Sequence, residues 1–123
     1  MSEGSDKSAR AEDKRYESRG KLKLAGKDFN YETSSAWLPL KEGDTRKADV
    51  FHTYYRKPRG GGGKRPLTFV VNGGPGASSA FLHVGTVGPK RVECGAEGSL
   101  PAAPARLVDN QETWLAFTDL VFV

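Results

Sequence analysis

The chain has 123 residues, of which 37% are hydrophobic, and its 19 Lys and Arg against 15 Asp and Glu give a formal net charge of +4. This length allows one domain with a modest core, and the basic residues are scattered among acids rather than gathered into the stripe typical of nucleic-acid binding. The single cysteine, Cys94, excludes an internal disulfide and a cysteine-rich zinc site.

The N-terminal residues are polar. The first twenty contain no Leu, Ile, Val or Phe, so little apolar surface offsets the entropy of ordering them. We therefore expect residues 1–20 to be a disordered polar tail and residues 21–123 to form the domain. No apolar run resembles a signal peptide or a membrane span, so the chain as written is expected to be cytoplasmic, with no membrane partner.

Strand patterns follow the tail. Apolar residues alternate at Leu22, Leu24, Phe29 and Tyr31. The turn residues 26–28 lie between them, which predicts a hairpin. A second strand is predicted over 48–55, which is rich in β-branched and aromatic residues. Between them, Pro39 makes residues 37–40 an edge strand or a connection.

The second half of the chain begins with a glycine-rich segment. Residues 59–65 contain four consecutive glycines and are expected to be a flexible bridge. The apolar run 67–71 predicts a strand buried on both faces, and 120–123 predicts another. Between them we expect one or two helical turns over 78–87, and an irregular excursion over 88–106, which is interrupted by proline and glycine.

The order of these elements indicates a fold class. Two buried strands separated by a long crossover imply a right-handed parallel unit, which is the signature of α/β folds. The leading hairpins imply antiparallel pairing. We therefore predict an α/β chain whose mixed sheet has antiparallel leading strands and parallel core strands.

The glycine-rich turn at Asn72–Ser79 follows the first predicted core strand, and ligands of open α/β sheets bind at this end of such strands. It does not fit a phosphate cradle, since Ser79 stands where the dinucleotide pattern needs glycine and no Gly-Lys-Ser/Thr follows. A purely structural turn remains possible. An oxyanion hole also fits, because α/β-hydrolases take one backbone donor from such an early loop.

The sequence of this turn, NGGPGASS, resembles the NGGPG-x-SS signature of the serine carboxypeptidases, which belong to the α/β-hydrolase superfamily. Residues 81–92 and 106–123 are similar to segments of bacterial members, and weaker similarity reaches back to about Lys21. The resemblance implies the N-terminal part of an α/β-hydrolase fold. It also implies acyl-enzyme proteolysis at the C-terminus of a peptide or protein substrate, with no cofactor; some relatives are exported.

The same resemblance assigns roles to three residues. The backbone N–H of Gly74, together with that of Gly73, is expected to stabilise the oxyanion of the tetrahedral intermediate, and Asn72 to hold the terminal carboxylate of the substrate. The nucleophilic serine, the aspartate and the histidine are expected beyond Val123. We therefore predict that this chain is an N-terminal fragment without peptidase activity of its own.

Other polar residues are expected to be decoys. The segment around Ser78 and Ser79 lacks the final glycine of the G-x-S-x-G elbow. His83 is five positions after Ser78, so the two side chains would not lie on the same face of a helix. His52 is expected to be half-buried surface. Asp109 and Asp119 are expected to lie in turns or helix caps.

Two alternatives to a serine carboxypeptidase stay open. One is a non-catalytic hydrolase-like binding fragment or remnant, which the missing triad favours. The other is an α/β-hydrolase of the aminopeptidase or esterase type, which typically has histidine where Asn72 stands.

Overall fold

The computed structural model describes residues 13–58 and 63–123. Its strands are β1 (Arg15–Leu24), β2 (Lys27–Glu42), β3 (Thr45–Arg56), β4 (Leu67–Val70), β5 (Lys90–Val92), β6 (Leu107–Asp109) and β7 (Asp119–Phe122). Its helical segments are α1 (Ala80–Leu82), η2 (His83–Val87), η3 (Ala96–Gly98) and η4 (Trp114–Ala116).

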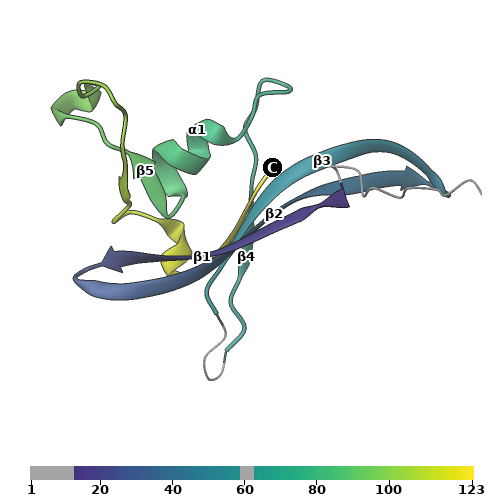
Figure 1. Cartoon of the computed structure of the whole chain (residues 1–123), viewed down its shortest axis with the longest axis horizontal. Coiled ribbons are helices and arrows are strands. Elements are labelled where there is room, and N and C mark those ends of the chain that lie inside the picture. Colours follow the sequence, from purple (N-terminus) through teal and green to yellow (C-terminus); the bar gives the residue numbers. More distant parts are fainter. Residues whose placement is uncertain (1–12, 59–62) are drawn as a thin grey trace, which may run out of the picture.

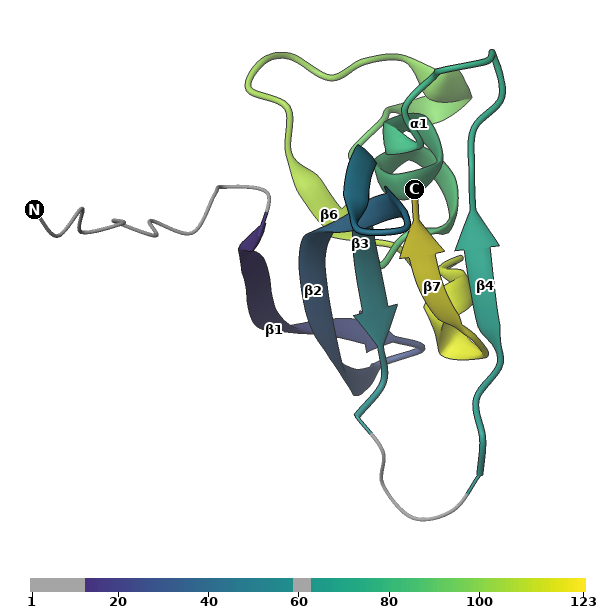
Figure 2. The ribbon, with the colours of Figure 1, turned by 90° about the vertical axis from the view of Figure 1, so that its right-hand side faces the viewer.

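Five strands form the main sheet, in the order β1-β2-β3-β7-β4 (Figure 2). Neighbours from β1 to β7 pair antiparallel, whereas β4 pairs with β7 in parallel. The parallel pairing expected between residues 67–71 and 120–123 is therefore present. The short strands β5 and β6 form a separate antiparallel pair.

Tight turns join the three leading strands. The turn between β1 and β2 has positive φ at Ala25 (49°) and Gly26 (78°), and Gly43 has φ 59° in the next turn. Such left-handed backbone matches the twist of a two-stranded hairpin. Pro39 lies in the part of β2 that pairs only with β3 among the described residues, so the prediction of an edge segment around it is confirmed.

The core lies between one face of the sheet and the short helical segments, which Figure 1 shows on the same side of the sheet as β5. Its buried members are Leu22, Tyr31, Val70, Leu115, Leu120 and Phe122. Side chains from α1 and η2 pack against this cluster, and they are Leu82 and Val87. The apolar residues of the first hairpin and of both parallel strands thus meet in one core.

The predicted fold class is wrong. The structure is mostly β, with 49% strand and 14% helix, and is not a typical α/β-hydrolase fold. The crossover from β4 to β7 explains the difference. Its first helical part ends at Val87, and the glycines and prolines that follow leave room only for β5, β6, the three-residue segments η3 and η4, and irregular chain. No long helix of the described residues therefore covers the sheet.

The expected tail and bridge lie partly outside the described residues. Residues 1–12 and 59–62 are not described. Strand β1, however, begins at Arg15, inside the segment expected to be a disordered tail, and pairs with β2 from Arg15 onwards. The sequence pattern missed this strand because backbone pairing, rather than apolar side chains, holds residues 15–20. At the far end of the bridge, Arg65 donates to the side chain of Asp119.

Candidate functional site

The loop Asn72–Ser79 begins two residues after the end of β4. Because β4 and β7 are parallel, their carboxyl ends meet at the same edge of the sheet. Val123 continues this pairing past β7, since its N–H donates to the carbonyl of Val70 at 3.1 Å. In Figure 2 the chain leaves the β4 arrow and rises into this loop, away from the sheet. The loop thus stands at the end of the sheet where the sequence predicted it.

Two glycines of the loop have backbone conformations that other residues rarely adopt. Gly74 has φ +140° and Gly76 has φ +85°. A Cβ on Gly74 would lie 3.1 Å from the Cβ of Ala77, whereas Gly73 has open space around it. Glycine at position 74 is therefore required both by the backbone angle and by the close approach of Ala77.

The first residues of this loop are exposed to solvent. Asn72, Gly73 and Gly74 are all exposed. Among the described residues, neither glycine N–H takes part in a backbone hydrogen bond, and the Asn72 side chain has no hydrogen-bond partner. These groups can therefore bind an anionic or carbonyl oxygen without losing an existing contact.

The two serines of the loop make local contacts. The Ser78 hydroxyl accepts a hydrogen bond from the backbone N–H of Ala80 at 3.2 Å. Ser79 is buried immediately before α1, and its carbonyl accepts from the N–H of His83 at 2.9 Å. Both contacts are local to the loop and the start of α1, as fits residues that were expected to be decoys rather than nucleophiles.

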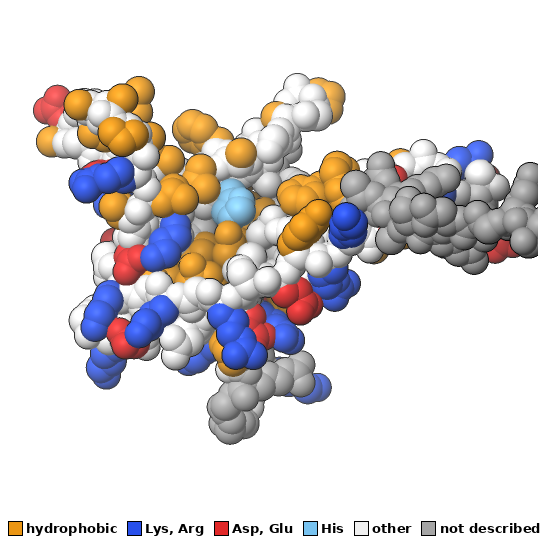
Figure 3. All heavy atoms as spheres, in the orientation of Figure 1, with side chains coloured by type: hydrophobic (Ala, Val, Ile, Leu, Met, Phe, Trp, Pro, Cys, Tyr) orange, Lys and Arg blue, Asp and Glu red, His pale blue; other side chains and the backbone are white. Residues whose placement is uncertain are grey.

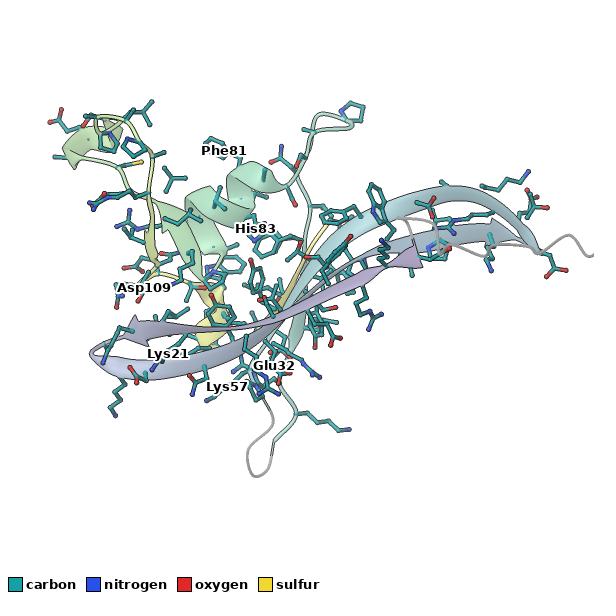
Figure 4. All side chains as sticks on the ribbon, in the orientation of Figure 1. Lys21, Glu32, Lys57, Phe81, His83 and Asp109 are labelled. Carbon is teal, nitrogen blue, oxygen red and sulfur yellow. The ribbon has the colours of Figure 1, made fainter. Side chains whose placement is uncertain are left out.

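His83 packs into the core rather than toward the loop serines. Its Nε2 is 2.6 Å from the hydroxyl of Tyr55, and its ring stacks on Phe122 with the centroids 4.3 Å apart. Burial lowers the pKa of His83 and raises the pKa of Tyr55 to about 12. Figure 3 shows hydrophobic side chains around a histidine at the place where Figure 4 labels His83. His83 is therefore a packed, neutral side chain.

The two remaining aspartates were predicted to lie in turns or caps, but Asp109 ends strand β6 and Asp119 begins strand β7. His52 is half-buried, as expected. Asp109 binds the Lys90 ammonium, which holds the pKa of this carboxyl below its usual value, and also accepts from the Lys23 N–H. Asp119 accepts from Arg65 Nε at 2.9 Å. Among the described residues, no serine hydroxyl is hydrogen-bonded to a histidine ring, so these residues contain no serine–histidine–carboxylate triad. The pairing of Tyr55 with His83 had no signal in the sequence, since the two lie in distant elements.

Strand β4 is buried on one face only. Val70 faces the core, whereas the side chains of Leu67, Phe69 and Val71 are 50%, 66% and 63% exposed. The prediction of a strand buried on both faces is wrong here, because no described strand pairs with the free edge of β4 and no described element covers its outer face. The loop therefore projects from an apolar, open part of the sheet.

Comparison of the chain with protein-family models, curated proteins and solved structures finds no significant match. In the described ranges no helix is long and apolar enough to cross a membrane. Nor do three or more His, Cys, Asp or Glu side chains of these ranges come together as metal ligands would. The resemblance to serine carboxypeptidases therefore stays a prediction from the residues of the sequence.

Proposed function

We propose that Asn72–Ser79 forms part of the oxyanion hole of a serine-type carboxypeptidase. The observation that carries this proposal is the pair of exposed N–H groups at Gly73 and Gly74, which make no backbone hydrogen bond with the described residues, at the carboxyl end of a parallel strand pair. The signature NGGPGASS, which resembles that of these peptidases, supports it.

Each residue has a role in the reaction. Attack on a peptide carbonyl turns its oxygen into an oxyanion, and backbone N–H groups already aimed at that oxygen stabilise the transition state. The N–H of Gly74, with that of Gly73, is the proposed donor. The exposed amide of Asn72 would donate to the terminal carboxylate of the substrate, which restricts cleavage to C-terminal residues.

The covalent step needs a nucleophile that the described residues do not supply. His83 is bonded to Tyr55, and the loop serines make only local contacts. The proposal therefore assigns nucleophile, aspartate and histidine to sequence downstream of Val123, as the resemblance implies, and expects no hydrolysis by this chain alone. The same observation supports a second candidate, a non-catalytic binding segment related to hydrolases.

The test starts from the gene. The reading frame past codon 123 should encode a G-x-S-x-G serine followed by an aspartate and a histidine. In the protein it encodes, Gly74→Ala should lower kcat/KM by about 10²–10³, the effect of losing one oxyanion donor, because a Cβ there meets Ala77 at 3.1 Å. Hydrolysis of N-blocked dipeptides measures this.

The matched control is Gly98→Ala. Like Gly74, Gly98 has positive φ (75°), but a Cβ on Gly98 would meet nothing within 4 Å, and the residue lies in the excursion between β5 and β6. The Gly98→Ala variant should keep its activity, although it too places an alanine at positive φ. Full activity in Gly74→Ala would rule out the oxyanion role, and a frame without a downstream serine would favour the non-catalytic candidate.

A further inference from the structure

A concave surface lies on the face of the sheet opposite the core. It is a pocket of ≈ 340 Å³ over β1, β2 and β3. Its lining residues are Arg15, Glu17, Ser18, Arg19, Glu32, Thr33, Ser34, Tyr54 and Arg56. Figure 4 shows Glu32 on the side of the sheet away from His83 and Phe81. The pocket is therefore separate from the core face and from the helical segments.

Strand register builds this pocket. Arg19, Glu32 and Arg56 are direct cross-strand neighbours on three adjacent strands. Arg15 and Glu17 precede Arg19 by four and two residues on β1, so their side chains point to the same face. The charged row and its neighbours thus share one surface, although they are spread over more than forty residues of sequence.

The arginines of this pocket are not all neutralised. The Glu32 carboxylate lies 2.5 Å from a guanidinium nitrogen of Arg56 but 3.8 Å from that of Arg19, whose side chain is 88% exposed. Arg15 forms no ion pair with any described residue. With three arginines and two glutamates, the lining carries one positive charge in excess.

We propose that this pocket binds a small monoanionic carboxylate whose body carries hydroxyl groups. Arg15 and Arg19 supply planar donor pairs that fit a carboxylate, and one such group cancels the excess charge. Ser34 also lines the pocket and lies two residues from Glu32 on β2, so its side chain points to the same face and its hydroxyl can bond a hydroxyl of the ligand. The volume exceeds that of a lone carboxylate. Because this site faces away from α1 and His83, it does not depend on the proposed peptidase function.

The experiment is an NMR titration of the folded chain with D-gluconate, a carboxylate with five hydroxyls in its body. We expect shifts confined to the pocket-lining parts of β1, β2 and β3. Arg15→Gln should weaken binding about tenfold or more, since a charge-assisted hydrogen-bond donor is lost. Lys47→Gln removes an exposed positive charge that pairs with Glu42 outside the pocket, and should leave binding unchanged.

Two comparison ligands and a second variant complete the test. D-Glucose, which lacks the carboxylate, should not bind, and inorganic phosphate should bind more weakly than gluconate. If Arg15→Gln does not fold, Arg19→Gln carries the test, because its side chain is too exposed to support the fold. No shifts with gluconate, equal loss in Lys47→Gln, or tighter binding of phosphate would each overturn the proposal.

Discussion

The two halves of the main sheet are held together differently. Strands β1, β2 and β3 have 10, 16 and 12 residues and are joined by tight turns, whereas β4 and β7 have only four residues each and are far apart in sequence. Local turns and cross-strand pairs hold the first half. Long-range packing of a few side chains holds the second, which carries the candidate loop.

The difference extends to the outer surface of the sheet. Around Glu32 this face of the leading strands is polar, and ion pairs cross it from Glu32 to Arg19 and Arg56. Over β4 it is apolar and exposed. An exposed apolar edge strand invites pairing with another chain. The polar row around Glu32 therefore differs from the apolar surface next to the loop, although β2 and β3 also expose apolar side chains farther along, at Trp37, Leu38, Leu40 and Phe51.

The largest expected effect comes from the parallel half. Leu120→Ala should lower the free energy of unfolding by about 2–5 kcal/mol, because Leu120 is fully buried in β7 and its truncation leaves a cavity. Leu67→Ala, the same truncation on β4, should cost much less, since Leu67 is 50% exposed. Urea unfolding of both variants measures the contrast, and equal losses would mean that the outer face of β4 is covered in solution.

A smaller effect tests the hairpin half. A Cβ on Gly20 would lie 2.3 Å from Cζ of Tyr31, its cross-strand partner. Because the Tyr31 ring is buried, it cannot move aside freely, and Gly20→Ala should cost about 1–3 kcal/mol. Gly73→Ala is the control for losing a glycine without a clash, since nothing lies within 4 Å of its Cβ position and its φ is not positive. A Gly20→Ala variant as stable as the parent would contradict this register.

The smallest effect is a pH dependence that links the two halves. Burial lowers the pKa of His83 from its usual 6.5, so the unfolded chain binds this proton more readily than the folded one. The stabilisation that neutral His83 provides is complete when the pH is above the pKa of the unfolded chain. It is lost as the pH falls toward and through the lower pKa of the folded state. The urea midpoint should therefore drop between about pH 7.5 and about pH 5.5.

The variant His83→Phe isolates this titration. It keeps an aromatic ring against Phe122 but has no ionisable group and loses the bond to Tyr55. Its midpoint should change less over the same pH range. A parent midpoint that stays constant, or a variant that drops equally, would show that His83 is not the titrating group.

The local parts of the fold were predictable from the sequence. Alternation at Leu22, Leu24, Phe29 and Tyr31 and the turn residues between them predicted the first hairpin, because both signals act over a few residues. Strand β1 before Gly20 was missed, since its residues are polar and are held by backbone pairing with β2. The pocket arginines were missed for a related reason: only the register of three strands brings them together.

The long-range parts were predictable only in outline. The apolar runs at 67–71 and 120–123 predicted a parallel pair, and the one or two helical turns expected over 78–87 are present as α1 and η2. The α/β fold class was nevertheless wrong, because so short a helical segment does not cover the sheet. For the loop, the position and the need for glycine at Gly74 followed from the sequence. The pairing of His83 with Tyr55 did not, because it depends on tertiary packing.

The most direct test of the role proposed for the loop Asn72–Ser79 is whether its serines react as nucleophiles. If the loop binds an oxyanion and its serines only support it, incubation of the chain with a fluorophosphonate probe, followed by peptide mass spectrometry, should leave Ser78 and Ser79 unlabelled, because neither hydroxyl is hydrogen-bonded to a histidine ring. A serine hydrolase in the same reaction provides the positive control. Labelling of either serine would contradict the account, since it would make this loop the source of the nucleophile.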